Sequence, residues 1–273
     1  MRTIAHISDL HFGRVNNALI EPLLAALTTL APDVVAISGD LTQRARAQQF
    51  RDAQRFLNRI PFPQIVVPGN HDVPLYNVFA RFLTPLYNYR RYITNDLQPV
   101  YVDDEIVVIG INTARSLTFK DGRINAEQVD SIHARLAPFP DKTAIVVTHH
   151  PFDLPEGSDE KCVGRAKMAL AAFAQCGVDV LLSGHFHFSH AGETGGNDGE
   201  LAYSALLVHA GTTLSTRARG ESNAFNVLRI ESRKIIVEQV SWNPERNEFA
   251  FSHAESFVRE NLRWKRLASG ASA

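Results

Sequence analysis

The apolar residues in the first two thirds of the chain follow two alternating patterns. Residues at 19, 23, 24, 27 and 30, and again at 50, 56, 57 and 60, recur at helical spacing and predict two amphipathic helices. Short β-branched runs bounded by turn residues predict buried strands. These runs are residues 4–7, 34–37, 65–67, 106–111, 144–147 and 178–182.

The last third changes character. Residues 201–209, 223–230, 234–240 and 248–252 predict consecutive antiparallel strands. Parallel strand–helix units followed by antiparallel strands predict an α/β (α+β) fold with mixed sheets. We expect a four-layer αββα sandwich of two mixed β-sheets flanked by helices.

Length and composition limit the domain organisation. A chain of 273 residues with 45% hydrophobic residues can bury a substantial core. We expect a single domain over residues 1–273, with a core at about 3–241 and a C-terminal extension at 242–273 formed by a strand and a helix. No repeat or linker divides the chain.

The charge balance and the cysteines exclude several kinds of site. The formal net charge is -1, which disfavours a nucleic acid polymer as the substrate. Cys162 and Cys176 have no C-x-x-C spacing and no neighbouring ligand cluster, which argues against a thiolate metal site or a redox motif.

Candidate metal ligands follow five of the predicted strands. The clusters are Asp9-Leu10-His11, Gly39-Asp40, Gly69-Asn70-His71-Asp72, His149-His150-Pro151 and Gly184-His185-Phe186-His187. The carboxyl ends of strands in an open sheet meet at one edge, so these side chains should converge. Carboxylate oxygen and imidazole suit hard or borderline divalent ions. Two such ions about 3.5–4 Å apart can clamp the attacking and leaving oxygens of a displacement at phosphorus.

Each cluster alone also has a structural explanation. An Asp-x-His pair can cap a helix or lie at the surface, Asn70 and Asp72 can cap a turn, and His149 can be a satisfied core histidine. Five clusters in fixed order, each at the end of an apolar strand, would need five separate coincidences. The combination therefore favours a two-metal site.

The motifs D-x-H, GD, GNH-[DE], H and GH-x-H stand here in the order found in the calcineurin-like metallophosphoesterase superfamily, which the chain resembles over about residues 3–190. Within it, the chain is most similar to the bacterial class III cyclic-nucleotide phosphodiesterases. The family fold is a β-sandwich flanked by helices, and the resemblance implies that residues 1–273 form one metallophosphoesterase domain.

The resemblance also implies the roles of individual residues. Asp9, His11 and His187 would hold a first metal, Asn70, His149 and His185 a second, and Asp40 would bridge both. The cofactors would be two divalent ions among Mn, Fe, Zn and Co, and a hydroxide bridging them would attack phosphorus. His71 would be catalytic, assisting the leaving group as a general acid or a positive stabiliser, with Asp72 orienting it.

Four further residues have less specific signals. Arg217 and Arg219 lie in a polar loop at 210–223 and are candidate substrate-binding residues; surface ion pairs with nearby glutamates are an equal alternative. Arg14 follows the first motif and faces either the cleft or solvent. For His150 we expect packing beside a ligand rather than a direct catalytic role.

By resemblance, the chain is a metal-dependent phosphoric diester hydrolase acting on a small phosphodiester, and 3′,5′-cyclic nucleotides of the cAMP type are the first expectation. The alternatives are a glycerophosphodiesterase or a nucleotide-sugar lipid pyrophosphatase. A catalytically silent interaction scaffold is the non-enzyme alternative, disfavoured because all seven ligands and His71 are present.

The surroundings of these motifs predict location and partners. The candidate ligands begin at Asp9, and no stretch reaches the roughly 20 apolar residues of a membrane span. We therefore expect a cytoplasmic protein. The aromatic-rich segment 74–92 is a candidate for a substrate pocket or a homodimer interface.

Overall fold

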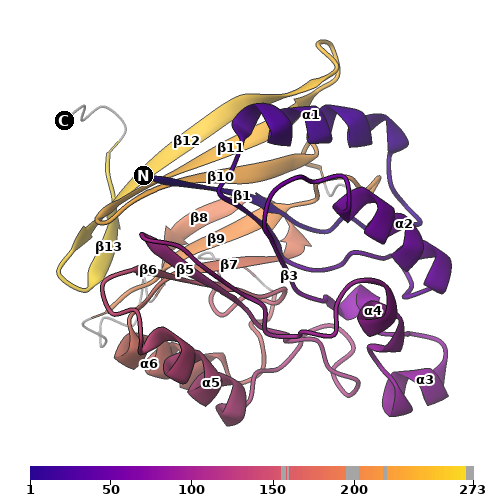
Figure 1. Ribbon diagram of the computed structural model, residues 1–273, viewed down its shortest axis with the longest axis horizontal. Helices are drawn as coiled ribbons and strands as arrows, with labels where there is room; N and C mark the ends of the chain where they lie inside the picture. The colour runs from indigo at the N-terminus through magenta and orange to yellow at the C-terminus, as the bar shows by residue number, and fades with distance from the viewer. Residues whose placement is uncertain (155–157, 159, 195–202, 218–219, 269–273) are drawn as a thin grey trace.

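Two β-sheets pack face to face, with helices on their outer faces (Figure 1). The computed structural model describes all residues except 155–157, 159, 195–202, 218–219 and 269–273. The prediction of two mixed sheets flanked by helices is confirmed.

The first sheet has seven strands in the order β13-β12-β11-β10-β1-β2-β3. Strands β1, β2 and β3 run parallel, and the others pair antiparallel. Their bounds are β1 (Arg2–Ile7), β2 (Val34–Ile37), β3 (Gln64–Val66), β10 (Ala224–Glu231), β11 (Lys234–Asn243), β12 (Glu248–Glu260) and β13 (Arg263–Arg266).

The second sheet has six strands in the order β4-β5-β6-β7-β9-β8. The central four are parallel, and the edge strands β4 and β8 are antiparallel. The bounds are β4 (Val100–Val102), β5 (Ile106–Gly110), β6 (Thr143–Val147), β7 (Val178–His187), β8 (His190–Glu193) and β9 (Leu206–Gly211). The sequence pattern did not predict β4 and β8, because three or four residues are too few to show a period.

The helices lie on both sides of the sandwich (Figure 1). On the first sheet lie η1 (Asn17–Leu19), α1 (Ile20–Leu30) and α2 (Ala47–Leu57), and on the second α5 (Ala126–Leu136) and α6 (Ala166–Cys176). The short elements η2 (Asn70–Asp72), α3 (Val78–Leu83) and α4 (Tyr87–Tyr92) follow β3. No helix in the described ranges is long and apolar enough to span a bilayer.

Three apolar layers hold the sheets and helices together. In β2, Val34 and Ala36 face the other sheet, whereas Val35 and Ile37 pack in the cluster that includes α1 and α2. All four side chains are fully buried. A strand covered on both faces reads as a continuous apolar run, which is why the sequence predicted it correctly.

The predicted C-terminal helix is wrong. Strand β12 runs on to Glu260 and turns into β13, and the described part of 242–273 contains no helix. Phe257 and Trp264 are 0% and 2% exposed and belong to the cluster between the sheets. The two strands pair antiparallel, with Phe257 opposite Arg266 and Arg259 opposite Trp264, so this segment forms a β-hairpin rather than the predicted helix.

Two histidines are buried within the sandwich. His6 in β1 contacts Ser38 Oγ through Nε2 at 2.9 Å, and His209 in β9 contacts Ser183 Oγ through Nδ1 at 2.8 Å. The second ring nitrogen of each has no hydrogen-bond partner among the described residues. Burial lowers the pKa of both histidines to about 3, so the folded protein holds them neutral.

We expect these histidines to make the fold sensitive to acid. The unfolded chain takes up their protons near pH 6.5 and the folded chain does not, so stability falls as pH decreases from about 6.5 toward 3, by about 1.4 kcal/mol per pH unit for each histidine. The variant His209→Asn keeps a nitrogen near the position of Nδ1. Urea unfolding with chelator at pH 6.5 and 5 should show the variant losing about 2 kcal/mol less than wild type. Equal losses would contradict the prediction.

Candidate metal centre

The carboxyl ends of strands from both sheets meet at one site. Asp9 and His11 follow β1, Asp40 follows β2, and Asn70 opens the short helix after β3. From the second sheet, His149 follows β6, and His185 and His187 end β7. Candidate ligands far apart in sequence are therefore positioned by the ends of largely buried strands.

A first cluster forms around Asp9. Its Oδ1 lies 3.1 Å from His187 Nε2 and 3.5 Å from His11 Nε2, and these two nitrogens are 3.3 Å apart. Asp40 Oδ2 lies 3.8 Å from His11 Nε2. Asp9, His11, Asp40 and His187 thus present one potential ligand atom each to a common point.

A second cluster forms around Asn70. Its Oδ1 lies 3.0 Å from His149 Nε2 and 3.1 Å from His185 Nδ1, and these nitrogens are 3.2 Å apart. Asp40 Oδ2 is also 3.4 Å from His149 Nε2, so this oxygen lies between the two clusters. The structure brings all seven predicted ligand residues together in the two groups that the resemblance implies.

The donor atoms fit divalent cations. Two carboxylates, one carboxamide oxygen and four imidazoles suit ions such as Mn²⁺, Fe²⁺, Zn²⁺ or Co²⁺. Asp9 Oδ1 is buried and accepts no hydrogen bond from a described residue. A buried carboxylate oxygen without a hydrogen-bond donor is costly, and a cation at this point would compensate Oδ1.

The charge states of these groups also suit a cation. Burial raises the pKa values of Asp9 and Asp40, but the nearby charges of His187 and His149, respectively, outweigh it and hold both carboxyl pKa values well below their usual range. Burial lowers the pKa of His149, yet the charge of Asp40 raises it to about 9 overall. Without a cation, a proton on this imidazole balances the carboxylate.

The backbone at the site is strained. Five of the seven candidate ligands have left-handed conformations, with φ values of 52° at Asp9, 49° at His11, 51° at Asp40, 78° at His185 and 66° at His187. Such conformations cost on the order of 1–3 kcal/mol per non-glycine residue and concentrate at functional sites. The strain indicates that the surrounding strands impose the positions of these side chains.

Two glycines allow the close approach. A Cβ at Gly69 would lie 2.1 Å from Asp40 Oδ1, and one at Gly184 would lie 1.9 Å from Ser8 Oγ and 2.5 Å from Asp9 Oδ2. Only a residue without a side chain lets these backbones pass so close to the carboxylates.

Asp72 fastens two ligand loops together. Its carboxylate accepts hydrogen bonds from the backbone N–H groups of Leu41 at 3.1 Å, Thr42 at 2.9 Å and Gly69 at 2.9 Å. Burial, followed by the negative charge of Asp40, raises the pKa of Asp72 to about 6. The expectation that Asp72 orients His71 is not met, because the Gln43 carbonyl, 2.9 Å from Nδ1, holds that ring.

His71 and Arg217 face the metal site together. Arg217 Nη1 donates to His71 Nε2 at 3.2 Å, and both line a cleft of about 260 Å³ with Asp40, Asn70 and His185. Burial is the main cause of the lowered pKa of His71; Asp40 opposes it, and the positive charge of Arg217 adds to it. Arg219 lies outside the described residues.

His150 lies beside the second cluster, where one ring nitrogen from each of His149, His150 and His185 lies within 4.8 Å of the others. Its ring centroid is 4.8 Å from that of His149 and 4.9 Å from that of His185, and its Nδ1 contacts Thr113 Oγ1 at 2.7 Å. Burial and its two histidine neighbours lower the pKa of His150 well below the usual value.

Other cleft-lining residues were not predicted. Gln43, Arg44, Phe119 and Lys120 come from loops without any motif. The one available signal is the position of Gln43 and Arg44, a few residues beyond Asp40 in the loop that follows β2.

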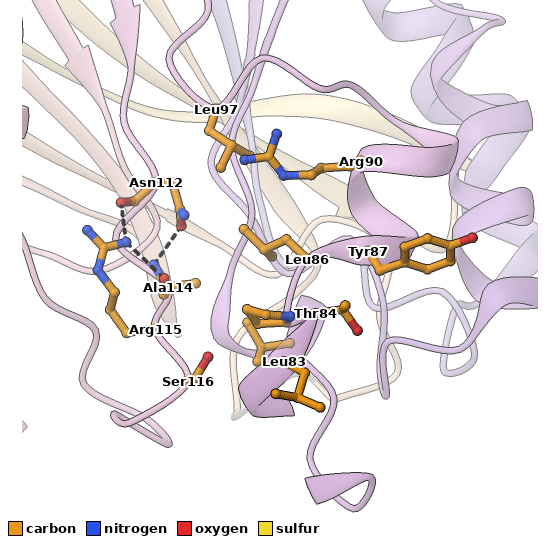
Figure 2. A pocket seen from close by; sticks show the side chains of 12 residues that line it. Leu83, Thr84, Leu86, Tyr87, Arg90, Leu97, Asn112, Ala114, Arg115 and Ser116 are labelled. Atoms are coloured by element: carbon orange, nitrogen blue, oxygen red, sulfur yellow. Dashed lines mark hydrogen bonds between the residues drawn. The ribbon is translucent and has the colours of Figure 1, made fainter. Parts of the chain in front are cut away.

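A separate cavity of about 430 Å³ lies beside α3 and α4 (Figure 2). Leu83, Leu86 and Tyr87 line it on one side and Asn112 and Arg115 on the other. The Arg115 guanidinium donates to the backbone carbonyl of Asn112 at 3.1 Å. None of the seven candidate ligands lines this cavity, whereas Asp40, Asn70, His185 and His187 line the cleft.

Comparisons with known proteins agree with this geometry. The family model of the calcineurin-like phosphoesterases matches residues 2–189, and the chain belongs to this family. It is 28% identical over 166 residues to a glycerophosphodiester phosphodiesterase, GpdQ, of Enterobacter lignolyticus, covering 57% of this chain and 58% of the relative. It is 26% identical over 200 residues to a probable cyclic nucleotide phosphodiesterase of Synechococcus, covering 68% and 73%.

Solved structures show the same fold. A purple acid phosphatase from yellow lupin superposes with a TM-score of 0.70 at 14% identity over 95% of this chain and 54% of that one. A dimetal phosphatase from Danio rerio gives a TM-score of 0.62 at 14% identity over 92% and 98%.

We expect removal of divalent ions to destabilise the protein, because strained ligands and buried carboxylates then lose their compensating charge. A ligand present at about 100 times its Kd contributes about 2.7 kcal/mol, which corresponds to roughly 5–10 °C in Tm for a chain of this size. Scanning calorimetry before and after EDTA treatment measures this shift, and added Mn²⁺ should restore it. A Tm that responds to neither EDTA nor Mn²⁺ would contradict cation binding.

Proposed function

We propose that the protein is a metal-dependent phosphoric diester hydrolase. Asp9, His11 and His187 would hold one divalent ion, Asn70, His149 and His185 would hold the other, and Asp40 lies between the two groups. The convergence of these side chains in two clusters that share one carboxylate is the observation that carries the proposal. When bound, the ions supply the positive charge that polarises a phosphoryl group and makes water acidic enough to attack at neutral pH.

Arg217 positions the substrate. Its guanidinium reaches the mouth of the cleft, and a planar fork of N–H groups matches two oxygens of a phosphate. A diester anion that binds there takes over the hydrogen bond now made to His71 Nε2. Arg217 thus exchanges a neutral acceptor for a charged one.

His71 supplies a proton to the leaving oxygen. The Gln43 carbonyl fixes the ring through Nδ1, so that Nε2 points toward the Arg217 side of the cleft. The negative charge of a bound diester opposes the effects that lower the pKa of His71 and favours the protonated ring. The proton on Nε2 then passes to the departing alkoxide, which is a poor leaving group without it.

Two small diesters are candidate substrates. The similarity to a probable cyclic nucleotide phosphodiesterase supports a 3′,5′-cyclic nucleotide, and the similarity to a glycerophosphodiester phosphodiesterase supports a glycerophosphodiester equally. A silent scaffold is disfavoured by the complete ligand set.

The test is hydrolysis by the Mn²⁺-loaded protein of 3′,5′-cyclic AMP, glycerophosphocholine and bis(p-nitrophenyl) phosphate, each with an EDTA control. We expect chelator-sensitive turnover of the activated diester and of at least one of the two natural diesters, because ions bound at the two clusters would polarise the phosphoryl group. No turnover of any substrate by a fully metal-loaded protein would favour the scaffold.

We expect His71→Ala to keep its metals and to lose activity mainly on diesters with poor leaving groups. Loss of a general acid costs about 10²- to 10⁴-fold in rate, and p-nitrophenolate needs little protonation. Rates on the natural and activated diesters, together with bound metal measured by elemental analysis, separate the two effects. An equal loss on both diesters accompanied by loss of metal would remove His71 from this role.

A further inference from the structure

A strongly basic cavity of about 500 Å³ adjoins the catalytic cleft. Four arginines line it, namely Arg14, Arg44, Arg46 and Arg217. Gln43, Arg44 and Arg217 line both the cavity and the cleft, so the two spaces adjoin. A group attached to a molecule at the metal clusters would therefore lie next to the cavity.

Positive side chains dominate the lining of this cavity. The chain as a whole has a net charge of -1, yet none of the described residues that line the cavity is a carboxylate. Within the described residues, no ion pair reaches Arg14, Arg44 or Arg46. Like charges gathered in a concave site repel one another and attract an anion.

The loop that carries two of these arginines is held in a strained conformation. Gln49 Oε1 accepts the backbone N–H of Arg44 at 2.9 Å and that of Arg46 at 3.4 Å. Between them, Ala45 has a φ of 52° and is buried, and its N–H donates to Thr42 Oγ1 at 3.0 Å. A left-handed alanine costs on the order of 1–3 kcal/mol, and such strain is retained where it places functional groups.

The segment that carries Arg14 is hydrogen-bonded to the segment that carries Arg217. The Arg14 carbonyl accepts hydrogen bonds from Thr216 N at 2.8 Å and from Thr216 Oγ1 at 3.1 Å, directly before Arg217. The arginines therefore come from three chain segments that are fixed by hydrogen bonds before any ligand binds. This preorganisation lowers the entropic cost of binding an anion.

We propose that this cavity binds a second phosphate group, so that the substrate is a phosphodiester carrying another phosphate beside the scissile one. The oxygens of one phosphate can accept hydrogen bonds from several guanidinium groups at once. A single carboxylate has too few oxygens to bind all of them. A cyclic mononucleotide or a glycerophosphodiester has only its scissile phosphate and leaves the cavity unfilled. The inference rests on the proposed function, because it requires a diester in the adjoining cleft.

The test compares three dinucleotides with the same internal diester: adenylyl-adenosine without a terminal phosphate, its 5′-phosphorylated form and its 3′-phosphorylated form. With the Mn²⁺-loaded protein, we expect kcat/KM for one phosphorylated form to exceed that of the unphosphorylated form about tenfold or more, since each charge-assisted contact is strong. A 5′-phosphorylated hexanucleotide shows the source of the second phosphate. If its kcat/KM equals that of the 5′-phosphorylated dinucleotide, the second phosphate belongs to an oligonucleotide chain. If its kcat/KM is lower, the second phosphate belongs to a small molecule.

The double variant Arg14→Gln/Arg46→Gln should abolish most of this preference. The matched control is Arg55→Gln on α2, because Arg55 is exposed and pairs with Asp52 at 3.1 Å. In EDTA, calorimetric titration should show tighter binding of adenosine 3′,5′-bisphosphate than of adenosine 5′-monophosphate, and the double variant should lose the difference.

Three equal kcat/KM values, or the same preference in the double variant, would overturn the second-phosphate site if bis(p-nitrophenyl) phosphate is still hydrolysed. If that activated diester is not hydrolysed, the proposed function fails instead. The calorimetric titration with adenosine 3′,5′-bisphosphate then still tests whether the cavity binds a second phosphate, because binding requires no turnover.

Discussion

The burial of two carboxylates, Asp9 and Asp40, where two sheets meet is the constraint on which the structure depends. Burial favours the neutral acid, and the charges of the surrounding imidazoles outweigh it and keep both groups charged. Four histidines surround these oxygens, and the backbones of two glycines pass close to them. Five of the seven candidate ligands have left-handed backbone conformations. The strands supply the rigidity that holds such an unfavourable arrangement in place.

Much of this could be predicted from the sequence. A strand buried on both faces is a continuous apolar run, so β2 was located to the residue and the other central strands within a few positions. The candidate ligands were found because each motif follows such a strand. Their grouping into two clusters did not follow from the residues alone but from the resemblance to a known family.

The rest depended on contacts that no local pattern contains. The carboxylate of Asp72 bonds to backbone amides thirty residues away, and the loop with Arg44 and Arg46 reaches the cleft only through the fold. The C-terminal hairpin was mistaken for a helix because Trp264 lies among basic residues, whereas its partner in the core, Phe257, is on another strand. Left-handed ligands were also unforeseen, because no glycine marks their positions.

The order of the ligands along the chain has a consequence for biosynthesis. His11 and His187 touch although 176 positions separate them, and Asp40 meets His149 from the other sheet. A chain emerging from the ribosome therefore presents Asp9, His11, Asp40 and Asn70 long before the last ligands are made. Neither cluster is complete until both sheets have docked, so a cation that needs a complete cluster would bind only late in folding.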